Sequence, residues 1–248
     1  MTATRIGAFS VVALPLVLSL VLTACDRSDP PSKQLERAAE DAIGEVQGED
    51  LPQIAEGPYA PRNECLDEPG AAAFLLELRN AVRVRDADAL LSLSADDIFL
   101  DFGGGTGADL LRERLAAEDG YLWDALDDIM ELGCASDGAR MTMPWYFTQD
   151  IPVDPYMGAV VMGEDVPLHS APNAESEEVG RISWGAVEAL ENVSDDGAYV
   201  AVRWEGGEDG EPVEGYIEAA KLRSIIDYRL IATRRNDRWR ITNLVAGD

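Results

Sequence analysis

The sequence predicts an α+β protein in which a small all-β barrel is inserted into a domain of helices on an antiparallel sheet. Helical periodicity dominates residues 71–132, whereas residues 158–223 show short strands punctuated by turns about every ten residues. A last pair of strands, 228–233 and 239–245, follows. We therefore assign 63–157 and 225–248 to the α+β domain and 158–224 to the barrel. An alternative, two consecutive domains with the last hairpin attached to the barrel, stays open.

Four helices are expected in the first part of the α+β domain. Residues 71–84 place Phe74, Leu75, Leu78 and Val82 on one face, and Asp86 or Asp88 caps a second helix over 87–93. The third and fourth helices are expected at 108–117 and 122–132. Strands are expected at 98–102, after an acidic loop at 94–97, and at 139–147, where Pro144 requires a sheet edge or a bulge.

Two stretches of this domain carry a resemblance. Residues 85–102, with the acidic step Ala95-Asp96-Asp97 before an apolar strand, resemble the opening of nuclear transport factor 2-like domains. The hairpin 228–245, with Arg238-Trp239-Arg240-Ile241-Thr242, is similar to the last two strands of the same family. The resemblance implies a cone-like fold of helices on an antiparallel sheet.

The all-β segment carries a second resemblance, to bacterial Src homology 3-like domains. The matching stretches, in order, are 166–172, 180–187, 199–202, 214–217 and Leu222. Tyr199 and Tyr216 stand where the family has tryptophans, and His169 replaces its usual arginine. The resemblance therefore implies the fold more firmly than the ligand.

The first 26 residues predict the cellular location of the protein. Arg5 precedes an uncharged apolar run, and residues 20–26, Leu-Val-Leu-Thr-Ala-Cys-Asp, resemble the lipobox of bacterial lipoproteins. The resemblance implies a signal peptide over 1–24, a lipidated Cys25, and a membrane anchor through its acyl chains. A Pro-rich stretch over 25–62 predicts a flexible tether, and Asp26 favours retention at the inner membrane. An uncleaved transmembrane anchor and plain secretion remain alternatives.

Composition narrows the classes of partner. The chain carries 20 basic and 47 acidic residues, a net charge of -27, which argues against nucleic acid and against lying flat on anionic lipid. A hydrophobic content of 46% supports packed cores. Outside the cytoplasm, Cys65 and Cys134 are candidates for a disulfide, with two buried free thiols as the alternative.

Candidate binding residues lie in the all-β segment. Trp184, Tyr199, Trp204 and Tyr216 are of the type that lines a peptide or glycan groove, and also of the type that fills a small barrel. We expect Tyr199 and Tyr216 to be partly core, and Trp184 and Trp204 to lie at the surface.

Catalytic and metal sites are not predicted. His169 is the only histidine, and a loop position is favoured over a ligand role. The run 103–107 favours a tight turn over a phosphate loop because it lacks the Gly-Lys-Ser/Thr ending, and Asp101 is favoured as a turn residue over a catalytic acid. Residues 195–197 lack the pattern of an EF-hand calcium loop.

The sequence therefore favours a non-catalytic role without cofactor or metal. We expect an envelope lipoprotein, anchored to the membrane and facing the periplasm, that binds peptidoglycan or another envelope protein. A small-molecule-binding or enzymatic α+β domain, with the barrel as an accessory, is the rival hypothesis.

Overall fold

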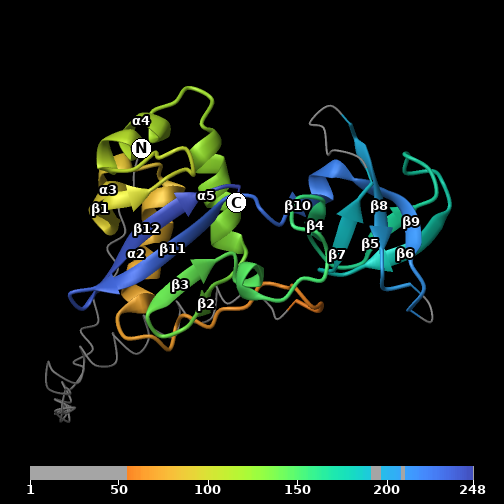
Figure 1. Ribbon diagram of the computed structural model, residues 1–248, viewed down its shortest axis with the longest axis horizontal. Coiled ribbons are helices and arrows are strands. Elements are labelled where there is room, and N and C mark those ends of the chain that lie inside the picture. Colours follow the sequence, from red (N-terminus) through yellow and green to blue (C-terminus); the bar gives the residue numbers. More distant parts are fainter. Residues whose placement is uncertain (1–54, 191–196, 208–209, 248) are drawn as a thin grey trace, which may run out of the picture. The chain divides into compact units, whose positions relative to one another are not determined.

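The computed structural model describes residues 55–190, 197–207 and 210–247 (Figure 1). The predicted lipidation site Cys25 and most of the predicted tether lie outside these residues. Within them, no helix combines the length and the apolar character needed to cross a membrane.

Helices and strands are mixed up to residue 148, and strands dominate afterwards. The helical elements are α2 (Ala71–Arg83), α3 (Ala87–Leu93), α4 (Ala108–Leu115), α5 (Tyr121–Glu131) and two 3-10 turns, η1 (Trp145–Thr148) and η3 (Ala219–Lys221). The strands are β1 (Ser94–Phe99), β2 (Ala135–Ser136), β3 (Arg140–Met143), β4 (Gly158–Val161), β5 (Val166–His169), β6 (Glu178–Ile182), β7 (Ala186–Ala189), β8 (Tyr199–Trp204), β9 (Val213–Glu218), β10 (Leu222–Ser224), β11 (Arg229–Arg235) and β12 (Arg238–Val245).

The α+β part is built on a five-stranded sheet in the order β1-β12-β11-β3-β2. β1 runs parallel to β12, and the remaining neighbours are antiparallel. α2, α3, α4 and α5 gather against one face of this sheet (Figure 1). The apolar faces of these helices share one core with alternate residues of the strands, including Leu78, Leu126, Met141, Trp239 and Ile241. Helices on one face of a mainly antiparallel sheet define the α+β class.

The C-terminal hairpin is central to this sheet. β11 pairs with β3 through Leu230 and Met143, and β12 pairs with β1 through Ile241 and Ser94. All strands from β4 to β10 lie between β3 and β11 in the sequence and form a separate sheet. The hairpin therefore belongs to the first sheet and not to the all-β segment.

Two predicted strands have different bounds in the structure. β1 begins at Ser94, within the stretch predicted as an acidic loop. Ser94 and Ala95 are buried, and Ser94 pairs with Ile241 of β12. Asp96 and Asp97 face solvent, and Asp97 forms an ion pair with Arg235. The pairing with β12 thus overrides the local turn signal. The strand predicted to run to residue 147 ends at Met143, because Pro144 has no N–H for the ladder and η1 follows.

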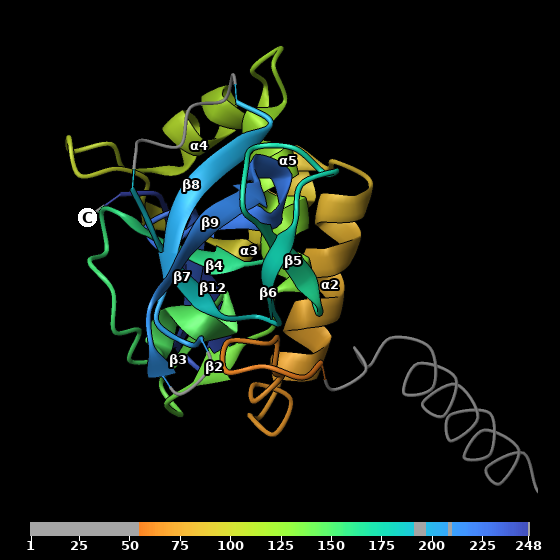
Figure 2. The same ribbon diagram turned by 90° about the vertical axis from the view of Figure 1, so that its right-hand side faces the viewer.

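The inserted segment forms a seven-stranded sheet in the order β10-β4-β7-β8-β9-β5-β6. Its longest ladder joins β8 to β9, seen in Figure 2 as two long curved strands side by side. Val187, Val200, Val202 and Ile217 are buried in its core. β10 and β6 remain as edges, and the strand pairs do not close into a ring. The small closed barrel predicted from the sequence is thus not shown, and the segment is called the inserted sheet below.

A buried charge joins the inserted sheet to the α+β part. Arg223 of β10 is 6% exposed; its Nε donates to the Tyr146 hydroxyl at 3.0 Å and its Nη2 to the Tyr228 carbonyl at 2.8 Å. Asp227 and Asp128 lie 3.3 and 3.5 Å from its Nη1. These partners compensate the loss of hydration that a buried guanidinium suffers.

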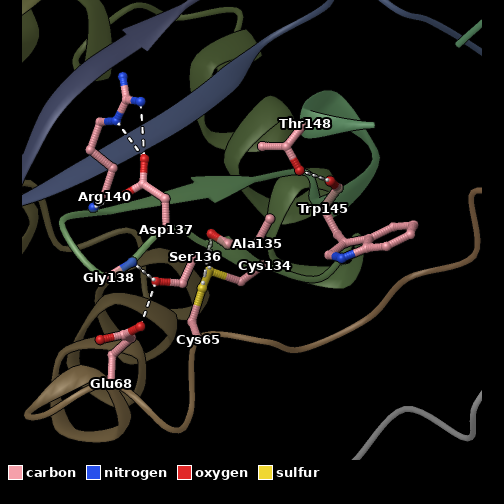
Figure 3. The surroundings of a disulfide bond; sticks show 10 residues. All are labelled: Cys65, Glu68, Cys134, Ala135, Ser136, Asp137, Gly138, Arg140, Trp145 and Thr148. Carbon is pink, nitrogen blue, oxygen red and sulfur yellow. Dashed lines mark hydrogen bonds and ion pairs between the residues drawn. A yellow bond between two sulfur atoms is a disulfide. The ribbon is translucent and has the colours of Figure 1, made fainter. Parts of the chain in front are cut away.

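Cys65 and Cys134, the two cysteines predicted to pair, form a disulfide with their Cα atoms 5.7 Å apart (Figure 3). Backbone bonds reinforce the link: the Glu64 N–H donates to the Cys134 carbonyl at 2.8 Å, and the Cys134 N–H donates to the Arg62 carbonyl at 2.7 Å. Beside the bridge, the Ser136 hydroxyl donates to Glu68 at 2.9 Å. The segment before α2 is therefore tied to the start of β2, 69 residues further along the chain.

Trp239→Ala should strongly destabilise the α+β part. The Trp239 side chain is 5% exposed, and its Nε1 donates to the Pro69 carbonyl at 3.0 Å. Truncation should lower the free energy of unfolding by about 3–5 kcal/mol, as for other buried tryptophans. Urea unfolding of this variant and of Arg238→Ala, an exposed neighbour, measures the effect. Equal midpoints for the two variants would contradict the assignment of Trp239 to the core.

Tyr146 should make stability depend on alkaline pH. Burial raises the pKa of Tyr146 from 10.0 to about 12, partly opposed by Arg223. Because the folded-state pKa is raised, the stabilisation is complete below about pH 10 and disappears as the pH rises through about 12, with an amplitude of about 2–3 kcal/mol. The difference in unfolding free energy between wild type and Tyr146→Phe should shrink as the pH rises from about 10 to about 12. A difference that stays constant with pH would contradict a raised pKa of Tyr146.

Candidate functional site

A cavity of about 420 Å³ opens on the inserted sheet. It is referred to below as the His169 pocket and is defined by the polar and aromatic residues of its lining, which are Glu164, Asp165, His169, Tyr199, Glu218 and Lys221. They come from the β4–β5 turn and from β5, β8, β9 and η3. Five separate segments thus converge on one hollow, within the size range of small-ligand sites.

Strand alternation explains why these side chains share one face. Val200 and Ile217 point into the core of the inserted sheet, so their neighbours Tyr199 and Glu218 point to the opposite face, where the two residues are directly paired. His169 joins them because β5 pairs with β9 at Tyr216. The ladder from β5 to β6 shifts register between Leu168 and His169, which marks a bulge at this position.

His169 is 5% exposed and occupies a strand, not the loop position favoured from the sequence. Its ring meets Tyr199 edge to face, with the ring centroids 5.8 Å apart. Its Nδ1 lies 3.4 Å from the Ser176 carbonyl, a long hydrogen bond. Because a carbonyl only accepts, Nδ1 carries the proton in this contact, and in a neutral ring Nε2 is left as an acceptor.

Loop 170–176, which contributes Ala174 to the lining of the pocket, is held by internal hydrogen bonds. The Ser176 hydroxyl donates to the Ala171 carbonyl at 3.0 Å and accepts from the Ala171 N–H at 3.2 Å. Since the same Ser176 residue offers its carbonyl to His169, the loop and the imidazole are positioned together.

The charges around the pocket are of both signs. Glu164 accepts from the Glu56 N–H at 2.6 Å, while the contacts of Asp165, with Ser183 and Arg181, are made by its backbone. Among the residues that the structure describes, the side chains of Glu218 and Lys221 have neither an ion pair nor a hydrogen bond. Three carboxylates and one ammonium therefore line the site. The carboxylate of Glu218 in β9 and the ammonium of Lys221 in η3 are available to a ligand.

The four aromatic residues predicted for binding do not form one groove. Tyr199 lines the His169 pocket, and Tyr216 lies beside it in register with His169. Trp204 is packed against the core of the inserted sheet, with its ring close to the backbone of Gly206. Trp184 is half-buried in the cluster that joins the inserted sheet to the α+β part, and its carbonyl accepts from the Tyr59 N–H at 3.0 Å. A binding role for the two tryptophans stays a prediction.

The glycine-rich turn at 103–107 is organised by a carboxylate. Asp101 accepts from the Gly105 N–H at 2.9 Å and forms an ion pair with Arg114. The Gly105 N–H and then Arg114 hold the pKa of Asp101 below its usual range. An anionic side chain therefore occupies the place that a phosphate would need. Asp195 and Asp196, weighed for calcium, lie outside the described residues.

The interior of the α+β part is filled by apolar side chains. Phe74, Leu78, Leu126, Met141 and Met143 pack together between the helices and the sheet. In the three described ranges, no aspartate or glutamate is buried.

The chain is similar to several solved structures. An NTF2-like protein of unknown function in nutrient uptake from Rhodospirillum rubrum is 16% identical; the match covers 71% of this chain and 95% of that chain, with a TM-score of 0.22. A protein of unknown function with a cystatin-like fold from Nostoc punctiforme is 10% identical, with coverages of 75% and 95% and a TM-score of 0.26.

A putative calcium/calmodulin dependent protein kinase II association domain from Xanthomonas campestris gives 10% identity, coverages of 77% and 98%, and a TM-score of 0.26. Scores this low carry no argument about function, and the α+β architecture rests on the strand pairing described above. No family model and no curated protein matches the chain.

Sequence reasoning missed Glu218 and Lys221. One signal was available: the chain has a single histidine and only two lysines, Lys33 and Lys221. Rare residue types draw attention, but only the pairing of β5 with β9 and of β8 with β9 shows that His169 and Lys221 line the same pocket.

Trp204→Ala should destabilise the inserted sheet because the ring is packed on its core. The ring is only partly buried, so the loss should be about 2 kcal/mol, below the range for a fully buried tryptophan. Chemical denaturation of this variant and of Tyr156→Ala, an aromatic residue that is 68% exposed, gives the comparison. An unchanged midpoint for Trp204→Ala would show that the ring is a surface group.

Proposed function

We propose that this protein is an envelope-anchored lipoprotein that acts as a non-catalytic binding or scaffold module. Its ligand is peptidoglycan or another envelope protein, and it is attached through Cys25 with its folded part in the periplasm. Asp26 favours the inner membrane. In this proposal the α+β part is a nuclear transport factor 2-like domain, and the inserted sheet is a bacterial Src homology 3-like domain with an open edge.

The observation that carries this proposal is the packing of the α+β interior. Phe74, Leu78, Met141 and their neighbours fill the interior of the α+β part between the helices and the sheet. The absence of a buried Asp or Glu among the described residues supports the same conclusion. The His169 pocket adds a place for a ligand on the inserted sheet.

Sequence features support the location. Residues 20–26 resemble a lipobox, and a paired Cys65 and Cys134 suits an oxidising compartment. The net charge of -27 suits a body held away from anionic lipid by a tether.

Cys25→Ser should release the protein from the membrane. With the acyl chains absent, the mature chain should move from the detergent phase to the aqueous phase in Triton X-114 partition. Ser28→Ala, a small change three residues further along the chain, is the matched control. A Cys25→Ser protein that is processed normally and still partitions into detergent would refute the anchor.

Binding is tested by co-sedimentation of the tagged mature chain with purified sacculi, together with a pull-down from envelope extract. We expect saturable retention on the sacculi or on one envelope protein. If neither retains the chain while a small metabolite stabilises it and is turned over, the enzymatic hypothesis replaces this one.

A further inference from the structure

We propose that the His169 pocket binds a short peptide that carries both a free ammonium and a free carboxylate. The inference rests on the proposed binding function, which it deepens by naming the class of ligand and the groups that recognise it.

The first argument concerns the ammonium. Glu218 is exposed, lies at the pocket, and has no charged partner among the described residues. Next to it, Tyr199 contributes an aromatic ring, and His169, whose Nδ1 lies near the Ser176 carbonyl, lines the same pocket. A carboxylate and an aromatic ring suit a primary ammonium, which donates three hydrogen bonds and is attracted to aromatic faces.

The second argument concerns the carboxylate of the ligand. Lys221 is the only lysine among the residues that the structure describes, and every other basic side chain there is an arginine or His169. Its ammonium forms no ion pair within those residues, although three carboxylates line the same pocket. The Met162 N–H donates to the Lys221 carbonyl at 2.7 Å, which fixes this residue at the wall of the pocket.

The two arguments together select a dipolar ligand. A cation alone would leave Lys221 repelling it, and an anion alone would face Glu164, Asp165 and Glu218. A molecule with an ammonium near Glu218 and a carboxylate near Lys221 satisfies both groups. The volume of about 420 Å³ accommodates a short peptide rather than a single ion.

Alanylalanine is a suitable probe because each of its charges can be removed separately. The full chain, purified in detergent, is titrated with alanylalanine, with its N-acetyl form and with its C-terminal amide, and binding is followed by NMR shifts and calorimetry. The free dipeptide should shift the signals of His169 and Tyr199. Each capped form should bind about tenfold more weakly, because a charge-assisted hydrogen bond is lost.

Two variants assign the charges. Lys221→Gln should bind the free dipeptide and its amide equally, and Glu218→Gln should bind the free dipeptide and its N-acetyl form equally. Glu211→Gln, a matched change at an exposed position outside the pocket, should retain both preferences. Because all three variants replace exposed side chains, folding should be retained, which thermal unfolding verifies.

The inference is overturned if the dipeptide shifts no pocket signal, if the three probes bind equally to wild type, or if the two variants keep both preferences. Its failure differs from that of the proposed function. If the chain binds sacculi or an envelope protein but not the dipeptide, only the proposal for the pocket is refuted. If it binds neither, the proposed binding function is refuted as well.

Discussion

The sheet of the α+β part is completed only by the last strands of the chain, and the rest of the structure follows from that constraint. β11 and β12 lie between β1 and β3, so the helices have a full apolar surface to cover only when residues after 228 are in place. The inserted sheet precedes β11 and β12 in the sequence, so the chain must leave the α+β part and return to it at one point. β4 and β10 provide this point, because Ala159 pairs with Ser224 and the Ile225 N–H donates to the Gly158 carbonyl at 3.1 Å.

Gly158 shows how tightly that point is closed. A Cβ atom at this position would lie 2.4 Å from the Ile225 side chain and 2.8 Å from the Asp154 carbonyl oxygen. A glycine is therefore required where the two connections meet. Arg223, two residues before Ile225, then carries a buried charge whose partners come from α5, from η1 and from the connection to β11. Removing one partner would leave that charge partly uncompensated, which couples the inserted sheet to the α+β part.

Sequence patterns predicted most elements of the fold because local signals and tertiary packing agree there. The helix at 71–83 has one apolar face, and Asp86 caps the next helix by accepting from the Ala89 N–H at 2.9 Å. Ser94 and Ala95 could not be predicted as strand, since only β12 makes them so. The sequence also could not decide whether the tryptophans lie at the surface or in the core. The Trp204 ring lies near Gly180 of β6, and only the folded sheet brings these two residues together.

The candidate site was harder to predict than the fold for a related reason. Tyr199 was recognisable as an aromatic residue of a small sheet, but His169, Glu218 and Lys221 carry no motif and meet only through strand pairing. The α+β part encloses an apolar core, and the inserted sheet holds at one cavity the only described lysine and a carboxylate that has no partner among the described residues. In the function proposed above, the inserted sheet carries the recognition chemistry and the α+β part supports it.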